Sequence, residues 1–477
     1  MRIVVLSLVG LMATSILAME TKGDVRSPLG DQDLRGQAQA TQRDYATLVS
    51  HCAESDCKGP DCNETCKGGC ESQQCDSCTS CGGSCCCGPL ESWLARDPFK
   101  LPQPCGLQKL GINTGGWLEV GTTLNGQDPG SNFNGPLLTN DRQGDLQMNQ
   151  LWLYMDRPVD TGGCGFDIGG RVDLLYRTDW RVAYFHGFGM EDALNGPDQL
   201  YGFSIPQLYA EVGINNLSVK MGRMMGILGY EIVPPMGNFF YSHSYSLCYG
   251  EPILITGMMG NYKLSKQVSV LAGFHQGIHR FEDNNHRLNF QGGVMWSSED
   301  KRWSLAYALD VGRNDFLPEV FHLGQEYVHS IVLKRQVTEN LLYVFQNDLG
   351  NAAGADGHAG ADWYSINQYL LYTINKKWSA GMRAEVFRDD DGTRVLGLGN
   401  LDARGWAPAN GGLPGYNGCF TELTLGVNWK PKSNILFRPE VRWDWYDGSR
   451  NLSNQLPFDD GNSSHQFTVA ADLVITF

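Results

Sequence analysis

The sequence predicts an all-β chain: an antiparallel up-and-down β-barrel of about 16 strands (14–18) that spans a membrane, with a cysteine-rich N-terminal extension. Three observations predict this fold. From residue 114 to 477, runs of about 9–13 residues alternate apolar and polar side chains, as strands with two unlike faces do. The connections between the runs are alternately short and long. No segment after residue 18 reads as a spanning helix, so strands would have to cross the membrane.

Residues 1–18 have the parts of a secretory signal peptide. Arg2 supplies the positive start, residues 3–11 form a short apolar core, and Ala18 is a plausible cleavage point. A membrane anchor is the alternative, although the apolar stretch is short for a spanning helix. Residues 19–51 are polar and without pattern, which predicts a flexible segment.

Eleven of the 15 cysteines lie within residues 52–87, which predicts a disulfide-stapled segment in an exported chain. Its C-x-x-C steps also suit a tetrahedral metal site, and cross-linking to other chains or to the cell wall is a third interpretation. Because eleven is odd, at least one cysteine must be free, pair with Cys105 or pair between chains. The disulfide candidates are Cys52, Cys57, Cys62, Cys66, Cys70, Cys75, Cys78, Cys81, Cys85, Cys86 and Cys87. Residues 88–113 follow as a proline-containing linker.

The strand-like runs of the barrel domain, residues 114–477, carry charge on one face and almost none on the other. The clearest is 434–446, where Arg438, Glu440, Arg442 and Asp444 oppose apolar residues. The predicted strands are 114–124, 146–156, 165–177, 206–214, 217–225, 253–263, 267–277, 289–297, 302–312, 326–336, 340–349, 363–374, 378–388, 419–430, 434–446 and 466–477.

The connections favour a transmembrane barrel over a soluble sandwich, whose strands would also alternate. Such a barrel has tight periplasmic turns at one rim and long external loops at the other. The long connections are 125–145, 178–205, 226–252, 278–288, 313–325, 350–362, 389–418 and 447–465. Tryptophans near the short turns, such as Trp303 and Trp378, are typical of a membrane–water boundary, although aromatic residues favour strands in any case.

The net charge of −15 disfavours a nucleic-acid binder. No catalytic or phosphate-binding motif occurs, so we expect no enzyme, cofactor or metal. We expect His275, His279 and the nearby His286 at a solvated rim, with a metal site there as the alternative. A 16-strand barrel leaves an aqueous channel, lined by inward charges or, in the plainer interpretation, by solvated salt-bridged residues. The pore-lining candidates are Arg171, Asp173, Arg177, Glu211, Lys220, Asp310, Arg383, Glu385, Glu422, Arg438, Glu440, Arg442 and Asp472.

The connection 226–252 is unusually aromatic and apolar for an external loop, and Pro234 and Pro235 stiffen it. Such a segment is unfavourable in water. We expect it to fold into the barrel and narrow it, with Glu231 as the acidic constriction candidate. Packing on the rim or at a subunit contact is the alternative.

The stretches "GWLEVGTTLN", "DIGGRVDLLYRTDW" and "SIPQLYAEVGINNLSVKMGRMMGILGYEIVPP", with the terminal aromatic strand, resemble the bacterial β-barrel porin family called porin-2 or OmpL-like. The resemblance covers about 114–477, and K-x-G-R…G-Y-E (220–231) is its most specific part. It implies an outer-membrane barrel that passes small solutes, and it supplies no established functional residues. The terminal Phe477 also resembles the signal read by the outer-membrane assembly machinery.

The leading hypothesis is a bacterial outer-membrane porin for passive diffusion of small hydrophilic solutes or ions, with a periplasmic N-terminal segment. Its partners would be outer-membrane lipid, the assembly machinery and other copies of the chain. The alternative is a structural surface protein whose cysteine-rich segment cross-links to neighbouring chains or the cell wall. A barrel enzyme or a secreted soluble β-protein is a third hypothesis.

Overall fold

The computed structural model describes residues 98–477 except 186, 196–198, 283–285, 314–322, 355–359 and 396–414. The predicted signal, polar and cysteine-rich segments (1–18, 19–51 and 52–87) lie outside the described residues. Within the described part, no helix has the length and apolar character needed to cross a membrane.

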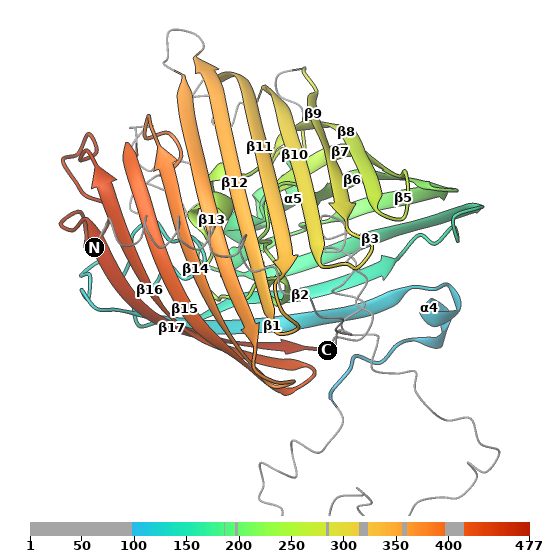
Figure 1. Cartoon of the computed structure of the whole chain (residues 1–477), viewed down its shortest axis with the longest axis horizontal. Coiled ribbons are helices and arrows are strands. Elements are labelled where there is room, and N and C mark those ends of the chain that lie inside the picture. Colours follow the sequence, from blue (N-terminus) through green and yellow to red (C-terminus); the bar gives the residue numbers. More distant parts are fainter. Residues whose placement is uncertain are drawn as a thin grey trace, which may run out of the picture.

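The described strands form one antiparallel sheet (Figure 1). They are β1 (Asn113–Asn125), β2 (Leu146–Arg157), β3 (Phe166–Arg177), β4 (Gly202–Ser204), β5 (Leu208–Ile214), β6 (Leu217–Met225), β7 (Leu254–Lys263), β8 (Val268–Ile278), β9 (Asn289–Ser297), β10 (Trp303–Arg313), β11 (Leu323–Gln336), β12 (Leu341–Gly354), β13 (Ala361–Thr373), β14 (Trp378–Asp389), β15 (Gly418–Lys432), β16 (Ile435–Gly448) and β17 (His465–Thr476). Because β4 and β5 both pair with β3, they are two parts of one wall strand. The wall therefore has 16 strands, as predicted.

The helical segments are few and short. They are α4 (Cys105–Lys109), η1 (Thr178–Val182), α5 (Gly189–Leu194), η2 (Pro235–Gly237) and η3 (Ser246–Gly250). α4 precedes β1, and the other four lie in the two long connections before β4 and before β7. The connections alternate short and long, so the short turns share one rim of the barrel and the long loops the other.

The sheet closes on itself through β1 and β17. Their register runs from Trp117 opposite Thr476 to Asn125 opposite Thr468. At the end of this seam the backbone N–H groups of Gly116 and Phe477 each donate to the other residue's carbonyl, both at 2.9 Å. A closed sheet has no free edge, which is the condition for strands to cross a membrane.

The two faces of the wall differ as the alternation predicts. On β17 the outward Val469 and Leu473 are 44% and 38% exposed, whereas the inward Asp472 is 1% exposed. Most of the large apolar residues that the strands leave exposed point outward, as expected for a lipid-facing surface. At the short-turn rim the rings of Trp378 and Trp429 stack with centroids 5.7 Å apart, which suits a membrane boundary.

Removing Phe477 should impair barrel closure, because the last pair of backbone hydrogen bonds in the seam is lost. We expect a lower yield of folded barrel, measured as the heat-modifiable band on gels after refolding into detergent. Phe477→Leu keeps both backbone bonds and is the matched control for closure. Equal yields for the deletion and for the wild type would show that this terminal pair does not matter.

Candidate functional site

The connection between β6 and β7, residues 226–253, lies inside the barrel, and we call it the inner loop. It contacts inward side chains from well-separated strands. Gln150 of β2 donates to the carbonyl of Val233 at 2.8 Å, and the indole of Trp363 of β13 donates to that of Gly250 at 3.1 Å. The expected entry of this segment into the barrel is therefore seen, and the rim alternative does not hold.

Two inward carboxylates of the wall hold backbone N–H groups of the inner loop. Glu440 of β16 accepts those at 241–242, at 2.8 and 3.1 Å. Glu385 of β14 accepts those at 245–246, at 2.7 and 2.8 Å. Hydrogen bonds to an ionised acceptor are about twice as strong as neutral ones. In a sheet, the carbonyl groups of a neighbouring strand would accept these N–H groups. Here the carboxylates of Glu440 and Glu385 accept them instead.

Three inward arginines hold the loop's carbonyl groups in the same way. Arg438 Nη1 lies 2.7–3.1 Å from three carbonyl oxygens between residues 235 and 240. Arg442 and Arg383 donate to carbonyls within 242–243, at 2.6 and 2.7 Å respectively. N–H groups and C=O groups of this irregular segment thus both find hydrogen-bond partners on the wall, which buried backbone groups require.

The sequence of β16 explains this fit. Its inward residues alternate in sign, with Arg438, Glu440, Arg442 and Asp444 at every second position. An extended backbone also alternates donor and acceptor groups. A row of alternating charges can therefore bind an extended segment laid along it.

The arginines are also paired with carboxylates of the wall. Arg438 Nη2 lies 2.5 Å from Asp472 of β17 and 3.1 Å from Glu119 of β1. Arg383 Nε lies 2.6 Å from Glu422 of β15. These ion pairs fix the side chains that hold the loop.

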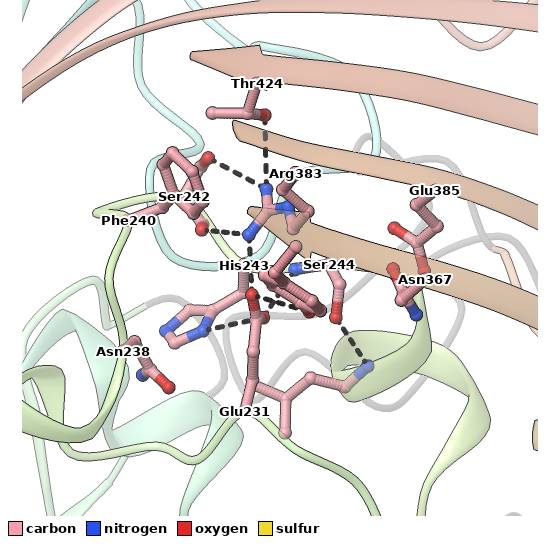
Figure 2. A network of polar contacts seen from close by, with 12 residues as sticks. Glu231, Asn238, Phe240, Ser242, His243, Ser244, Asn367, Arg383, Glu385 and Thr424 are labelled. Atoms are coloured by element: carbon pink, nitrogen blue, oxygen red, sulfur yellow. Dashed lines mark hydrogen bonds and ion pairs between the residues drawn. The ribbon is translucent and has the colours of Figure 1, made fainter. Parts of the chain in front are cut away.

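Glu231 lies within the inner loop and binds the wall from the other direction (Figure 2). Its Oε1 lies 2.7 Å from Arg383 Nη1, and its Oε2 accepts the N–H of Ser244 at 2.8 Å and lies 3.5 Å from His243 Nδ1. Burial alone would raise the pKa of Glu231. The Arg383 guanidinium, the His243 ring and the Ser244 N–H outweigh burial and hold the pKa well below its usual range.

Inward glycines leave space for the aromatic side chains of the loop. A Cβ at Gly381 of β14 would lie 2.4 Å from the ring of Phe239. A Cβ at Gly121 of β1 would lie 2.4 Å from the ring of Tyr241. A larger residue at either position would have to displace that aromatic ring.

Apolar side chains pack around these polar contacts between the inner loop and the wall. Ile227, Leu228 and Tyr245 of the inner loop belong to one buried cluster with Trp363 and Phe420 of the wall. The loop is therefore packed on its apolar side as well as hydrogen-bonded on its polar side.

Twelve of the thirteen predicted inward residues lie in three places. Seven of them surround the inner loop, as described above: Arg383, Glu385, Glu422, Arg438, Glu440, Arg442 and Asp472. A second group lies on β3, β5 and β6: Arg171 and Asp173, which are 2.7 Å apart, and the register neighbours Glu211 and Lys220. All of these are buried rather than solvated. Asp310 of β10 contacts His275 and Gln291, and Gln291 in turn accepts the N–H of Ile227 of the inner loop at 3.2 Å.

Arg177 differs from the other candidates. It ends β3 with a φ of 131°, and its guanidinium lies over the rings of Tyr176 and Tyr201, at 4.3 and 5.6 Å from their centroids. Both tyrosines are exposed. The alternation therefore fails at this strand end, and Arg177 is not part of the inner groups.

The expectation of solvated histidines is wrong for His275 and His279, since both are buried, whereas His286 is exposed. His275 Nε2 lies 2.7 Å from Asp310, to which Gln291 also donates at 3.0 Å. A buried carboxylate partner thus holds this ring inside the wall. Among the described residues, no three His, Cys, Asp or Glu side chains are placed to hold a metal ion.

Sequence reasoning missed Glu119 and Asp444 as site residues. Glu119 shares Arg438 with Asp472, and Asp444 lies 2.8 Å from Arg442 and accepts the hydroxyl of Tyr245 at 2.8 Å. Both have the inward parity of their strands, so the signal that found the other candidates would have found them.

Replacing Glu231 by glutamine should destabilise the barrel in a pH-dependent way, because a lowered pKa adds stability only where the carboxyl is ionised. We expect a loss of about 3–5 kcal/mol in the free energy of unfolding at pH 7, the usual cost of removing one partner of a buried ion pair. The difference should persist down to the unfolded-state pKa of about 4.3 and shrink as the pH falls further. Urea unfolding in detergent at several pH values measures it. A difference that is the same at pH 3 and pH 7 would contradict the ion pair.

The family described as "Putative beta-barrel porin-2, OmpL-like" matches residues 111–477. No curated protein matches the sequence. Among solved structures, the outer membrane channel DcaP of Acinetobacter baumannii is 12% identical, with a TM-score of 0.48 over 77% of this chain and 97% of that chain. OmpT of Vibrio cholerae is 10% identical (TM-score 0.49, 77% and 97%). An anion-selective porin from Comamonas acidovorans is 10% identical (TM-score 0.49, 77% and 99%). The family match over most of the chain shows that this protein belongs to the β-barrel porin-2, OmpL-like family.

Proposed function

We propose that the protein is an outer-membrane channel for the passive diffusion of small hydrophilic solutes or ions, in which the inner loop restricts the bore. The observation that carries the proposal is the seating of residues 238–246 on the charged inner faces of β14 and β16. A wall with an apolar outside and a charged inside suits lipid on one face and water on the other. A segment fixed across that interior then decides what passes.

The binding of residues 238–246 to the wall also favours a narrow, selective bore over a wide one. Glu231 and Arg383 pair across the loop–wall contact, so opposite charges face each other inside the barrel. Buried ion pairs of this kind act on passage by fixing the loop that narrows the bore. A bore narrowed in this way would admit only small solutes.

Further parts of the proposal concern the cell. Residues 1–18 would direct export, and the N-terminal segment would lie in the periplasm, on the side of the short turns. Lipid would surround the apolar face, and the assembly machinery would insert the barrel. Copies of the chain would associate into an oligomer.

Single-channel recording in planar bilayers tests the function. Wild-type protein should give small, discrete conductance steps, and a shift of reversal potential in a salt gradient should report the ion preference. Replacing residues 236–248 by a glycine–serine segment of equal length should raise the conductance several-fold, because the side chains and the anchored backbone are lost.

Asp390→Asn is the matched control. Asp390 pairs with Arg388 at the long-loop rim, where its side chain is 42% exposed, so its conductance should equal that of the wild type. A folded, heat-modifiable barrel that conducts neither before nor after loop replacement would overturn the proposal.

A further inference from the structure

Two carboxylates of the barrel interior differ from those that hold the inner loop. Glu251 lies near the end of the inner loop, and Asp348 lies on β12. Among the described residues, neither pairs with a basic side chain and neither accepts a backbone N–H. Instead, Gln346 Nε2 lies 2.6 Å from Glu251 Oε1 and 2.6 Å from Asp348 Oδ2. Two acidic groups therefore flank a single amide nitrogen.

Two buried oxygen atoms in this region have no hydrogen-bond partner. Asp348 is 1% exposed, and its Oδ2 accepts the hydroxyl of Ser365 at 2.9 Å, but its Oδ1 accepts nothing. On β13, Asn367 is fully buried and donates from Nδ2 to the Ser246 hydroxyl at 2.7 Å, while its Oδ1 accepts nothing. Asn367 is the register partner of Gln346, and Ser365 that of Asp348. The two unpartnered oxygens thus belong to one inward group on neighbouring strands, and buried acceptors of this kind need a partner.

The chemistry of this group suits a hard cation. Its candidate ligands are all oxygen atoms, from the carboxylates of Glu251 and Asp348 and from the amide of Asn367. Ca²⁺ takes about 6–8 oxygen ligands from carboxylates, amide carbonyls and water, in a flexible geometry. Two carboxylates balance its charge. Such a site differs from one with three acidic or histidine ligands, which is not found in the described part of the chain.

Both ends of the inner loop meet the wall at this place. Near the start of the loop, the N–H of Tyr230 donates to Gln346 Oε1 at 2.9 Å, and that of Gly229 donates to the Ser330 hydroxyl at 3.2 Å. Gly229 has a φ of 83°, and a Cβ there would overlap the Glu251 carboxylate. Glu251, near the end of the loop, is therefore packed against the start of the loop beside β12.

We propose that Glu251 and Asp348, together with the amide oxygen of Asn367, bind a calcium ion that joins both ends of the inner loop to β12. The ion supplies the positive charge that arginines supply to the carboxylates on β14–β17. The inner loop is then fixed by a metal ion on one side of the barrel and by ion pairs on the other.

Isothermal titration calorimetry of the full chain, folded in detergent and freed of divalent ions with a chelator, tests the site. Calcium chloride should give a saturable heat of binding. It should also raise the midpoint temperature of unfolding above that in sodium chloride of equal ionic strength, because a ligand that binds only the folded state stabilises it. Neither signal depends on whether the barrel conducts, so a failure of this proposal is distinct from a failure of the proposed channel.

Asp348→Asn and Glu251→Gln test the two ligands, because each removes one charge and keeps the size of the side chain. Each variant should lose the heat of calcium binding and the rise in midpoint temperature. In chelator, each should be at least as stable as the wild type, since the repulsion between two like charges is relieved. Side chains with a purely structural role would instead give a lower midpoint with and without calcium, which would contradict the proposal.

Asp145→Asn is the matched control, because Asp145 is an exposed carboxylate in the long connection before β2. It should bind calcium as the wild type does. The proposal is wrong if the wild type gives neither signal or if either ligand variant keeps both. It is also wrong if acid raises the wild-type midpoint and calcium does not, which would show that the two carboxylates share a proton.

Discussion

The hydrogen bonding of an irregular backbone segment to charged side chains is the constraint on which the barrel interior depends. Inside a closed sheet the segment 238–246 has neither a strand neighbour nor free access to water. An amide buried without a partner costs about 1–3 kcal/mol by protein mutational data. Glu385 and Glu440 accept hydrogen bonds from N–H groups of the loop. Three arginines donate to its carbonyl groups: Arg383, Arg438 and Arg442. Without them the loop would not remain in the lumen.

The same constraint explains why so many charges are buried in this wall. A buried arginine is stable here because it meets both a carboxylate and loop carbonyls, as Arg438 meets Asp472, Glu119 and the loop. Removing one partner of such a group leaves an uncompensated charge, which typically costs about 3–5 kcal/mol. The charges therefore serve first to hold a segment and only through that segment to shape a passage.

Both halves of the motif K-x-G-R…G-Y-E take part in loop anchoring. Arg223, at the end of β6, lies 2.6 Å from Glu191 of α5, in the preceding long connection. Glu231, near the start of the inner loop, lies 2.7 Å from Arg383 of β14. The motif thus fixes two successive long connections to the wall by buried ion pairs. These ion pairs explain what two of the motif residues do, whereas the sequence alone showed only a family resemblance.

Most of the wall could be predicted from the sequence, because a strand repeats every two residues and a closed sheet gives each face one environment. The inward parity of Arg438, Glu440 and Arg442 followed directly. Whether those charges meet water or protein could not be predicted, because alternation is the same in both cases. The path of the inner loop has no period at all, and the burial of His275 depends on Asp310, a residue 35 positions away. The inward position predicted for Arg177 was wrong because the regular strand ends there, at a residue with a φ of 131°.

Hydrogen–deuterium exchange of the folded barrel in detergent tests the central claim most directly. Peptides that cover residues 238–246 carry no strand hydrogen bonds, so protection there comes from side-chain acceptors of the wall and of Glu231, from the turn at Asn238 and from burial. We predict that these amides exchange as slowly as those of β14 and β16. Exchange within seconds, at the rate of the exposed turn residues 299–300, would show that the loop is not held inside the barrel and would contradict the account.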